Sequence, residues 1–427
     1  MTTTWSNGDV DGGQTLTDND HLYPAHINEL RTAVNTVEGN RVTYVAPVGS
    51  TSDWTTDVTN IQAAIDTSEE VILGEGTFYL SGKNGSNPYY IFNCSSAIKF
   101  TGQGLVKTQL RIKSDVDSVT DIFLIAPTAA TEGYQFRDFA VIPYSTVCAR
   151  HAFHVNLTSC AEGGASKFIM ENVYFGSASP GYFGGAWNGY DFYLTNPSLA
   201  NGFYLSRFSD CMFNNGLYFN RLGDSNRIER CYFGGVNRGC TVASMATAGG
   251  GSSSMFTVDN CNAYIRNGVL KLTGTRFKIT NNNFETVTGD GVTTPTAVVE
   301  INGSDLATGL ADFCTVNDNL MTVASLDCHA LYIQNAVGTT INRNYLVGGR
   351  MGAASRDLYL DTGADYTYIG MEQAHAPDGF NYTDAGTNTQ WSLSSKVYTP
   401  PVLATGAGKT VDEVITALQS IGLVTQS

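Results

Sequence analysis

Charged residues are scarce in this chain of 427 residues: Asp, Glu, Lys and Arg make up 15% of it, whereas glycine occurs 45 times. That composition is typical of a turn-rich all-β protein and disfavours a helical one. Positive charge is especially low, with 24 Lys and Arg against 39 Asp and Glu, a formal net charge of −15. An acidic surface argues against nucleic acid as a partner, because binding a phosphate backbone requires clustered basic residues.

Other signals are missing as well. No apolar run is long enough to span a bilayer, and no charged-then-apolar leader opens the chain, so we expect no membrane insertion and no export by a signal peptide. The nine cysteines include no CxxC pair, and we expect buried free thiols from folding in a reducing compartment. The six histidines are scattered, and His151 and His154 alternate as on a strand with no third ligand in sight. We therefore predict neither a metal nor a cofactor.

A six-residue pattern recurs seven times between Phe168 and Leu346. Each copy has an apolar residue, two variable residues, an anchor Asn or Cys, one variable residue, and a final apolar or small residue. The anchors are Asn172, Cys211, Cys231, Cys261, Asn282, Asn319 and Asn344. A constant unit separated by spacers of varying length predicts a solenoid, with insertions bulging from its loops.

The residues of the repeat indicate which solenoid. Its apolar positions are β-branched or aromatic, which favours strands, and a period of roughly 20–30 residues fits one coil of a three-faced parallel β-helix. Stacked coils would place the anchors in one column, where Asn amides exchange hydrogen bonds and Cys acts as a small apolar filler. Phe139 would be the anchor of an early coil, and 366–371 a last coil. A β-sandwich with coincidentally similar strands is the alternative.

Both ends of the chain carry short apolar stripes. Ile27, Leu30, Val34 and Val37 predict a helix from about Pro24, and a similar stripe predicts a second helix at 410–421. Such narrow stripes suit coiled-coil seams between chains, although the first helix could equally lie on its own domain. We therefore divide the chain into a head segment at 1–41, a β-helix at 42–375, and a linker with an oligomerisation helix at 376–427.

Residues 42–80 resemble the opening of the pectate-lyase-like superfamily. NIQAAID at 60–66 predicts a short amphipathic helix, and GEGTFYL at 74–80 follows as a strand. In that superfamily an IQxAID helix caps the β-helix, and a strand ending in PxGTYxL enters the first coil. Here Gly74 stands where the proline is usual. The resemblance implies a right-handed parallel β-helix with a helical cap over its open end.

With its short helical head and a tail helix, the whole chain resembles a bacteriophage tailspike or tail fibre. This resemblance implies a homotrimer attached to a phage tail or baseplate protein through the N-terminal segment. It also implies a location in the virion tail, after synthesis in the host cytoplasm and release by lysis. Such proteins bind host cell-surface polysaccharide, and many depolymerise it. The alternatives are a non-catalytic virion fibre with the same fold and a cellular pectate-lyase-like polysaccharide lyase.

Glycosidic hydrolysis needs two carboxylates about 5–10 Å apart, and adjacent coils of a β-helix offer that spacing. Asp210 and Glu229 lie on successive coils, and Asp224 precedes the second of them. We predict these three as catalytic and favour a glycoside hydrolase over a lyase. The alternative is that they are surface carboxylates paired with neighbouring arginines.

Sugar rings stack on aromatic side chains, and the segment Gly176–Asn201 is rich in them. We predict carbohydrate binding by residues of this segment together with one nearby arginine: Tyr182, Trp187, Tyr190, Asp191, Tyr193 and Arg227. We further expect the catalytic carboxylates on the flank where this segment folds. The alternative is an aromatic loop packed on its own coil or on a neighbouring chain.

Overall fold

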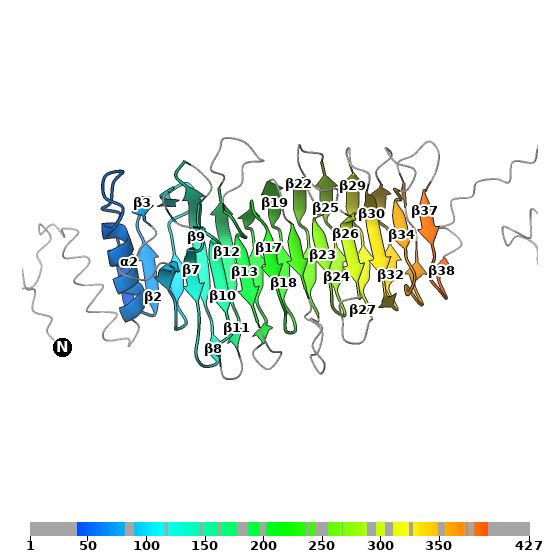
Figure 1. The fold of residues 1–427 in the computed structure, drawn as a ribbon, viewed down its shortest axis with the longest axis horizontal. Coiled ribbons are helices and arrows are strands. Elements are labelled where there is room, and N and C mark those ends of the chain that lie inside the picture. The colour runs from blue at the N-terminus through cyan, green and yellow to red at the C-terminus, as the bar shows by residue number, and fades with distance from the viewer. Residues whose placement is uncertain are drawn as a thin grey trace, which may run out of the picture.

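The computed structural model describes residues 41–81, 89–114, 116, 118–145, 148–160, 164–176, 187–196, 202–235, 239–243, 255–266, 268–287, 296–303, 311–323, 328–348, 355–370, 373–374 and 380–391. The two predicted terminal helices and Tyr182 lie outside them. The described residues form a solenoid of stacked coils whose named strands pair in parallel (Figure 1). This is the predicted right-handed parallel β-helix.

Two of the three faces belong to one 22-stranded sheet. The first face carries β1 (Val42–Val45), β2 (Glu70–Leu73), β5 (Lys99–Thr101), β9 (Gln135–Pro143), β12 (Ile169–Phe175), β15 (Arg207–Ser209), β18 (Arg227–Glu229), β21 (Thr257–Asp259), β24 (Lys278–Thr280), β28 (Thr315–Asn317), β32 (Thr340–Asn342), β35 (Tyr368–Ile369) and β38 (Gln390–Trp391). The second face carries β3 (Gly76–Leu80), β6 (Thr108–Ile112), the ends of β9 and β12, β16 (Met212–Phe213), β19 (Tyr232–Gly235), β22 (Asn262–Ile265), β25 (Asn283–Thr286), β29 (Leu320–Val323), β33 (Tyr345–Val347) and β36 (Gln373–Ala374).

The third face is an eleven-stranded sheet. In spatial order from the N-terminal end it contains β4 (Tyr90–Asn93), β7 (Asp121–Ile125), β10 (Phe153–Asn156), β13 (Phe192–Thr195), β17 (Leu217–Phe219), β20 (Cys240–Val242), β23 (Leu270–Leu272), β26 (Ala297–Asn302), β30 (His329–Gln334), β34 (Leu358–Leu360) and β37 (Tyr382–Asp384). Smaller sheets lie in the loops, formed by β8 (Thr131–Glu132), β11 (Ala165–Ser166) and β14 (Phe203–Tyr204), and by β27 (Ala311–Asp312) and β31 (Ala336–Val337). The stacking continues past residue 375, the predicted end, because β37 and β38 add strands up to Trp391.

The predicted cap is present as the helix α2 (Thr56–Thr67), which covers the N-terminal end of the solenoid (Figure 1). The helix buries its own residues Val58, Ile61 and Ala64 against the solenoid. Asp57 is also buried, and its carboxylate accepts backbone N–H groups of Val48 and of Tyr79 at the start of the first coil. The helix is therefore fixed to the first coil by apolar contact and by hydrogen bonds to a carboxylate.

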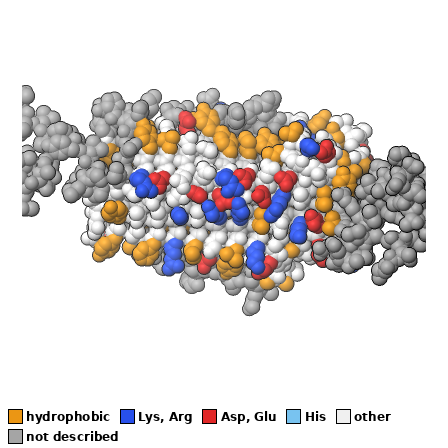
Figure 2. Space-filling view, turned by 180° about the vertical axis from the view of Figure 1, so that it is seen from behind, with side chains coloured by type: hydrophobic (Ala, Val, Ile, Leu, Met, Phe, Trp, Pro, Cys, Tyr) orange, Lys and Arg blue, Asp and Glu red, His pale blue; other side chains and the backbone are white. Residues whose placement is uncertain are grey.

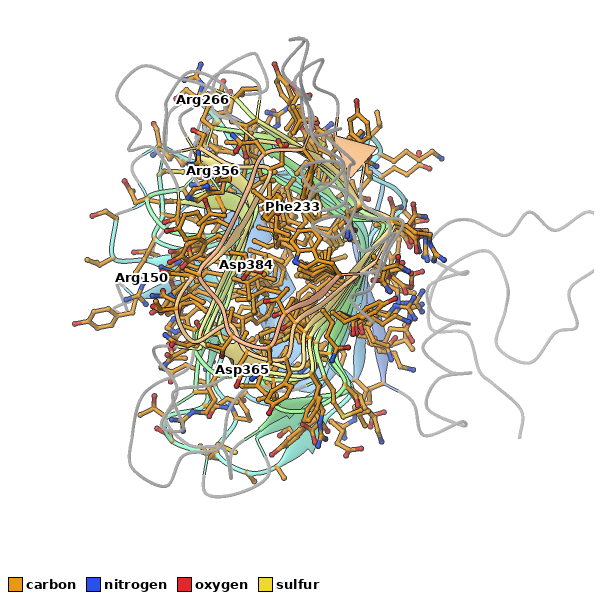
Figure 3. All side chains as sticks on the ribbon, turned by 90° about the vertical axis from the view of Figure 1, so that its right-hand side faces the viewer. Arg150, Phe233, Arg266, Arg356, Asp365 and Asp384 are labelled. Carbon is orange, nitrogen blue, oxygen red and sulfur yellow. The ribbon has the colours of Figure 1, made fainter. Side chains whose placement is uncertain are left out.

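The interior is filled by one aromatic and aliphatic core, into which Phe233 points when the solenoid is viewed along its long axis (Figure 3). Phe123 and Phe153 on neighbouring coils stack with ring centroids 4.5 Å apart. All nine cysteines are free and buried, as predicted. Within the described part of the chain, no helix is long and apolar enough to cross a membrane, and no group of three His, Cys, Asp or Glu is placed to hold a metal ion.

The anchor column exists, with one correction. Strand register aligns Cys211, Cys231, Cys261, Asn282, Asn319 and Asn344. The same register pairs Met170 with Phe208 and Tyr174 with Met212, so Val173 and not Asn172 belongs to the column. Asn172 occupies the preceding position, where the backbone is left-handed (φ 52°). Phe139 pairs with Val173 and is an anchor, as predicted.

The anchors interact as the repeat predicts. The Asn282 side chain donates to Asn319 Oδ1 at 2.9 Å, and Asn319 donates to Asn344 Oδ1 at 2.8 Å. The Cys231 thiol donates weakly to the carbonyls of Phe208 and Glu229 instead. A residue in the left-handed region precedes the anchors of these coils and bends the chain from the first face to the second, a conformation that Asn and Asp tolerate best.

Candidate functional site

Asp210 and Glu229 lie in an ion-pair network on the first face. Figure 2 shows a band of charged side chains that runs along one face of the solenoid. Glu229 contacts three guanidinium groups, those of Arg207, Arg227 and Arg230, and only 6% of its side chain is exposed. Arg230 also holds Asp210 with two bonds of 2.8 and 2.6 Å. Both carboxylates are thus paired with arginines, as the alternative raised from the sequence expects, although Glu229 is buried.

Arg227, predicted to bind carbohydrate, belongs to the same network. Besides Glu229, it contacts Asp259 at 3.0 Å. Burial opposes ionisation of Asp259, but hydrogen bonds from Asn281, Thr280 and Arg227 together outweigh that effect and lower its pKa. The charges of this network are thus satisfied by one another.

Asp224 lies apart from this network, at the corner between the eleven-stranded sheet and the first face. It lines a cavity of about 470 Å³ together with residues of three preceding coils, among them Glu132, Ser166 and Tyr204. Its side chain is exposed, and its backbone carbonyl accepts the N–H of Leu205. Since 204 is two coils after 132 in the small sheet, Glu132 and Asp224 are separated by about three coils or roughly 14 Å, too far to act as a hydrolytic pair.

The side chains of Trp187 and Asp191 are buried and form hydrogen bonds that fix the local backbone. The Trp187 indole N–H donates to Asp191 Oδ1 at 2.9 Å, and Asp191 Oδ2 accepts the backbone N–H groups of Asn214, Asn215 and Gly216. Burial raises the pKa of Asp191 to about 7, although these four donors favour the ionised form. Asp191 therefore fixes the turn that leads into β17, and neither side chain offers a surface to a sugar.

Tyr190 and Tyr193 lie on the outer side of the eleven-stranded sheet. They form a cluster with three further rings, and we call these five side chains the proximal platform: His151, His154, Tyr190, Tyr193 and Tyr218. Tyr193 stacks on His151 with centroids 4.3 Å apart and rings 8° from parallel, and on Tyr218 at 5.0 Å and 13°. The His151 ring is oriented by the backbone N–H of Tyr190, which donates to its Nδ1 at 3.0 Å.

A hydrogen-bonded chain of polar groups borders the proximal platform. His154 Nδ1 lies 2.7 Å from the buried carboxylate of Asp121, and His154 Nε2 lies 3.0 Å from the Thr195 hydroxyl. Arg150 grips the same carboxylate with two bonds, of 2.9 and 2.5 Å. Burial opposes ionisation of Asp121, but Arg150 and His154 outweigh it and lower its pKa, so the carboxylate is charged. The charged carboxylate favours the His154 tautomer with a proton on Nδ1, which leaves Nε2 to accept from Thr195.

The structure brings Tyr190 and Tyr193 together on the eleven-stranded sheet and brings Arg227, Asp210 and Glu229 together in the first-face network, so the predicted sugar-binding tyrosines and the predicted carboxylate pair are separated. Trp187 and Asp191 are bonded to each other in the interior, and Asp224 lies at the corner. Sequence reasoning missed Asp121, Arg150, His151, His154, Thr195 and Tyr218. The neighbouring histidines were a usable signal: His151 lies just before strand β10, and the strand places His154 beside Tyr193 of the next coil, because these two residues are register partners.

The fold places the chain in one structural class, the right-handed parallel β-helices. No family model and no curated protein sequence matches it. Among solved structures, the A-module of mannuronan C-5 epimerase AlgE4 from Azotobacter vinelandii has a TM-score of 0.50 at 12% identity, covering 82% of this chain and 100% of that one. The Streptococcus pneumoniae surface protein and adhesin PfbA also has a TM-score of 0.50 at 12% identity, covering 82% of this chain and 97% of that one.

A third similar structure is tailspike protein 3 of bacteriophage CBA120, with a TM-score of 0.44 at 10% identity. The alignment covers 84% of this chain and 59% of that one. The two structures with a TM-score of 0.50 establish a shared fold, and what these proteins do is not carried over to this chain by the fold alone.

Proposed function

We propose that this protein is a tailspike or tail-fibre component of a bacteriophage virion, and that it binds a host cell-surface polysaccharide on the proximal platform. One observation carries the proposal: half-exposed Tyr190, Tyr193 and Tyr218 stand with two histidines on the outer side of a rigid sheet. Sugar rings stack their C–H faces on such rings, and Arg150 and Thr195 at the border supply the polar partners that their hydroxyls need.

Depolymerisation is a second candidate function, favoured by the chain of Asp121, His154 and Thr195. An imidazole held between a carboxylate and a hydroxyl is a common general acid–base arrangement. His154 would then transfer the proton, and Asp121 would orient its ring. The pair of Asp210 and Glu229 remains a separate prediction for glycoside hydrolysis, on a face without such a platform.

The homotrimer is part of the same proposal, and a column of residues at one corner supports it. These residues precede the first-face strands by two positions and have left-handed backbones: Leu205, Ser225, Met255, Arg276, Phe313, Gly338 and Tyr366. Large apolar side chains alternate with small or polar ones, and the apolar ones are 45–64% exposed. Alternation places them about 9.6 Å apart, a spacing that a parallel second copy of this chain would match in register.

The test is binding to a panel of bacterial capsular and O-antigen polysaccharides immobilised on a surface. We expect the wild type to be retained by at least one of them, and Tyr193→Ala to lose at least tenfold in affinity. Tyr264→Ala on the second face is the matched control and should bind normally. Size analysis of the glycan after incubation tests cleavage: His154→Gln should abolish it if the platform is the active site, and Glu229→Gln if the first face is. Failure of the wild type to bind any host polysaccharide would refute the proposal.

A further inference from the structure

A second aromatic cluster lies farther along the eleven-stranded sheet. We call it the distal platform: His329, Tyr332, Arg356 and Tyr359. His329 and Tyr359 have ring centroids 4.7 Å apart, and Tyr332 and Tyr359 stack at 5.5 Å. All four side chains are partly exposed. Figure 3 shows Arg356 on the same side of the solenoid as Arg150, which borders the proximal platform.

The two platforms occupy equivalent positions in their coils. His329 precedes Tyr332 by three residues, as His151 precedes His154, and Tyr332 pairs with Tyr359 as His154 pairs with Tyr193. The orienting hydrogen bond also recurs. The backbone N–H of Arg356 donates to His329 Nδ1 at 3.1 Å, as that of Tyr190 donates to His151.

The polar contact at the border of the platform recurs too. The Tyr332 hydroxyl donates to Asp361 Oδ2 at 2.5 Å, and Asp361 stands two residues after Tyr359. At the proximal platform, His154 contacts Thr195, two residues after Tyr193. Burial and the bond to Asp361 raise the pKa of Tyr332. One arrangement of a turn histidine, a stacked tyrosine and a polar border is therefore built twice with different side chains.

Stacking for stability alone does not account for this repetition. A continuous stability ladder would carry aromatic residues through the intervening coils, as the interior does. The outward column between the platforms instead reads Thr241, Lys271 and Glu300, with the last two 3.8 Å apart. The aromatic residues are confined to two patches separated by polar side chains, which is how two binding subsites on one surface are arranged.

We propose that the distal platform is a second carbohydrate subsite, which binds a remote segment of the same polysaccharide chain. This inference rests on the proposed function of the proximal platform. From β10 to β30 is six coil steps, or about 29 Å. A pyranose residue advances a chain by about one strand spacing, so about six sugar residues span the two subsites. With Arg356 in the place of Tyr190, the distal subsite also offers a cation to an acidic substituent.

The test compares short and long fragments of the polysaccharide that the panel identifies, sorted to about two and about twelve sugar residues. The nearest rings of the two platforms, Tyr218 on β17 and Tyr332 on β30, are four coil steps or about 19 Å apart, so only the longer fragment spans both platforms. Binding is measured by calorimetry on the full chain. Two linked subsites raise affinity through effective concentration. We expect wild type to bind the long fragment at least tenfold more tightly than the short one, and Tyr359→Ala to remove that difference. Tyr359→Phe, which keeps the ring, should behave as wild type.

Arg356→Ala is a second variant of the same platform, and Tyr264→Ala is the control for both. If Tyr359→Ala and Arg356→Ala keep wild-type affinity for the long fragment while Tyr193→Ala loses it, the proximal platform binds alone and the distal subsite is refuted. If wild type binds neither fragment, the proposed function fails together with the inference. Circular dichroism of each variant establishes that the solenoid is folded.

Discussion

The anchor column has a cysteine half and an asparagine half, and exchanging the two residue types should affect stability differently in each half. Replacing an anchor asparagine by cysteine should be strongly destabilising, whereas replacing an anchor cysteine by asparagine should not. Asn319 is 2% exposed, and its side chain makes five hydrogen bonds. It accepts from the backbone and the side chain of Asn282, and it donates to Asn344 Oδ1, Asn317 O and Ile279 O. Cysteine can replace none of these at full strength. At about 1 kcal/mol per net hydrogen bond, with buried donors left unpaired, Asn319→Cys should cost about 3–5 kcal/mol.

The reverse exchange should be nearly neutral. Cys261 is also buried, and its thiol faces the carbonyls of Ile228 and Asp259 at 3.8 and 3.4 Å, the equivalents of those that Asn319 binds. The backbone N–H of Cys231 points to the Cys261 sulfur at 3.4 Å, where an amide oxygen would be a better acceptor. Cys261→Asn should therefore extend the ladder by one coil and change the unfolding free energy by less than about 1 kcal/mol.

Urea unfolding followed by circular dichroism measures both variants on the full-length protein, and an unchanged slope with denaturant would establish that the same surface is exposed. Asn319→Ala removes the hydrogen bonds and also reduces the side-chain volume. It should therefore lower the free energy of unfolding at least as much as Asn319→Cys does. The reasoning is refuted if Asn319→Cys is as stable as wild type and Cys261→Asn is strongly destabilised. That outcome would mean that side-chain volume, and not hydrogen bonding, sets the column.

Three further perturbations test other parts of the structure. Burial raises the pKa of Asp191 in the folded protein to about 7, above its ordinary value of 3.8, so between these pH values the folded state keeps a proton that the unfolded chain loses. The free energy of unfolding should therefore fall by up to about 1.4 kcal/mol per pH unit as pH rises from about 4 to 7. In unfolding measurements across this range, Asp191→Asn should remove that dependence on pH. Glu229→Gln should lower the free energy of unfolding by about 1–2 kcal/mol, because three guanidinium groups lose their shared carboxylate. In 1 M salt the difference between wild type and variant should become smaller, since salt screens the ion pairs. Equal stability of the two proteins would indicate that Glu229 has a role other than charge pairing. Leu205→Asn and Phe313→Asn should lower the mass measured by light scattering from that of three chains of 45.8 kDa towards that of one chain. Because asparagine tolerates the left-handed backbone at these positions better, each substitution should also stabilise the single chain by up to about 1 kcal/mol. An unchanged mass would show that this corner is not part of an interface between chains.

The solenoid and its anchor column were predictable because stacking imposes one register on every coil, and the register is visible as a repeated spacing. The prediction placed Asn172 at the anchor, one position after the one that it occupies, because asparagine is favoured both at the anchor and at the position before it. The reasons differ between the two positions. At the anchor its amide joins the ladder; one residue earlier it tolerates the left-handed bend. Apolar spacing favours Val173, which is fully buried.

The site was less predictable because a coil has three faces, and residues close in sequence turn to different ones. Asp210 and Tyr218 are eight residues apart yet lie on different sheets. The proximal platform instead joins residues of separate coils, such as His154 and Tyr193, through strand register. To find the register partners from the sequence, one must know the length of each loop, and loop lengths vary from coil to coil. The position of a residue within its own coil is therefore easier to predict than its neighbours on the adjacent coils.

The two faces also differ in what they leave available to a ligand. The network on the first face consists of three arginines and three carboxylates, namely Arg207, Arg227, Arg230, Asp210, Glu229 and Asp259. Its formal charge is 3 − 3 = 0, and each of its charges contacts an opposite one, so a polysaccharide that bound there would have to displace existing ion pairs. On the eleven-stranded sheet the charge of Asp121 is satisfied by Arg150 and His154, and the rings of Tyr190, Tyr193 and Tyr218 pack against one another while each side chain stays partly exposed. A glycan on the proximal platform would contact partly exposed rings, whereas one at the first-face network would compete with existing ion pairs, and for this reason we propose the platform as the glycan surface.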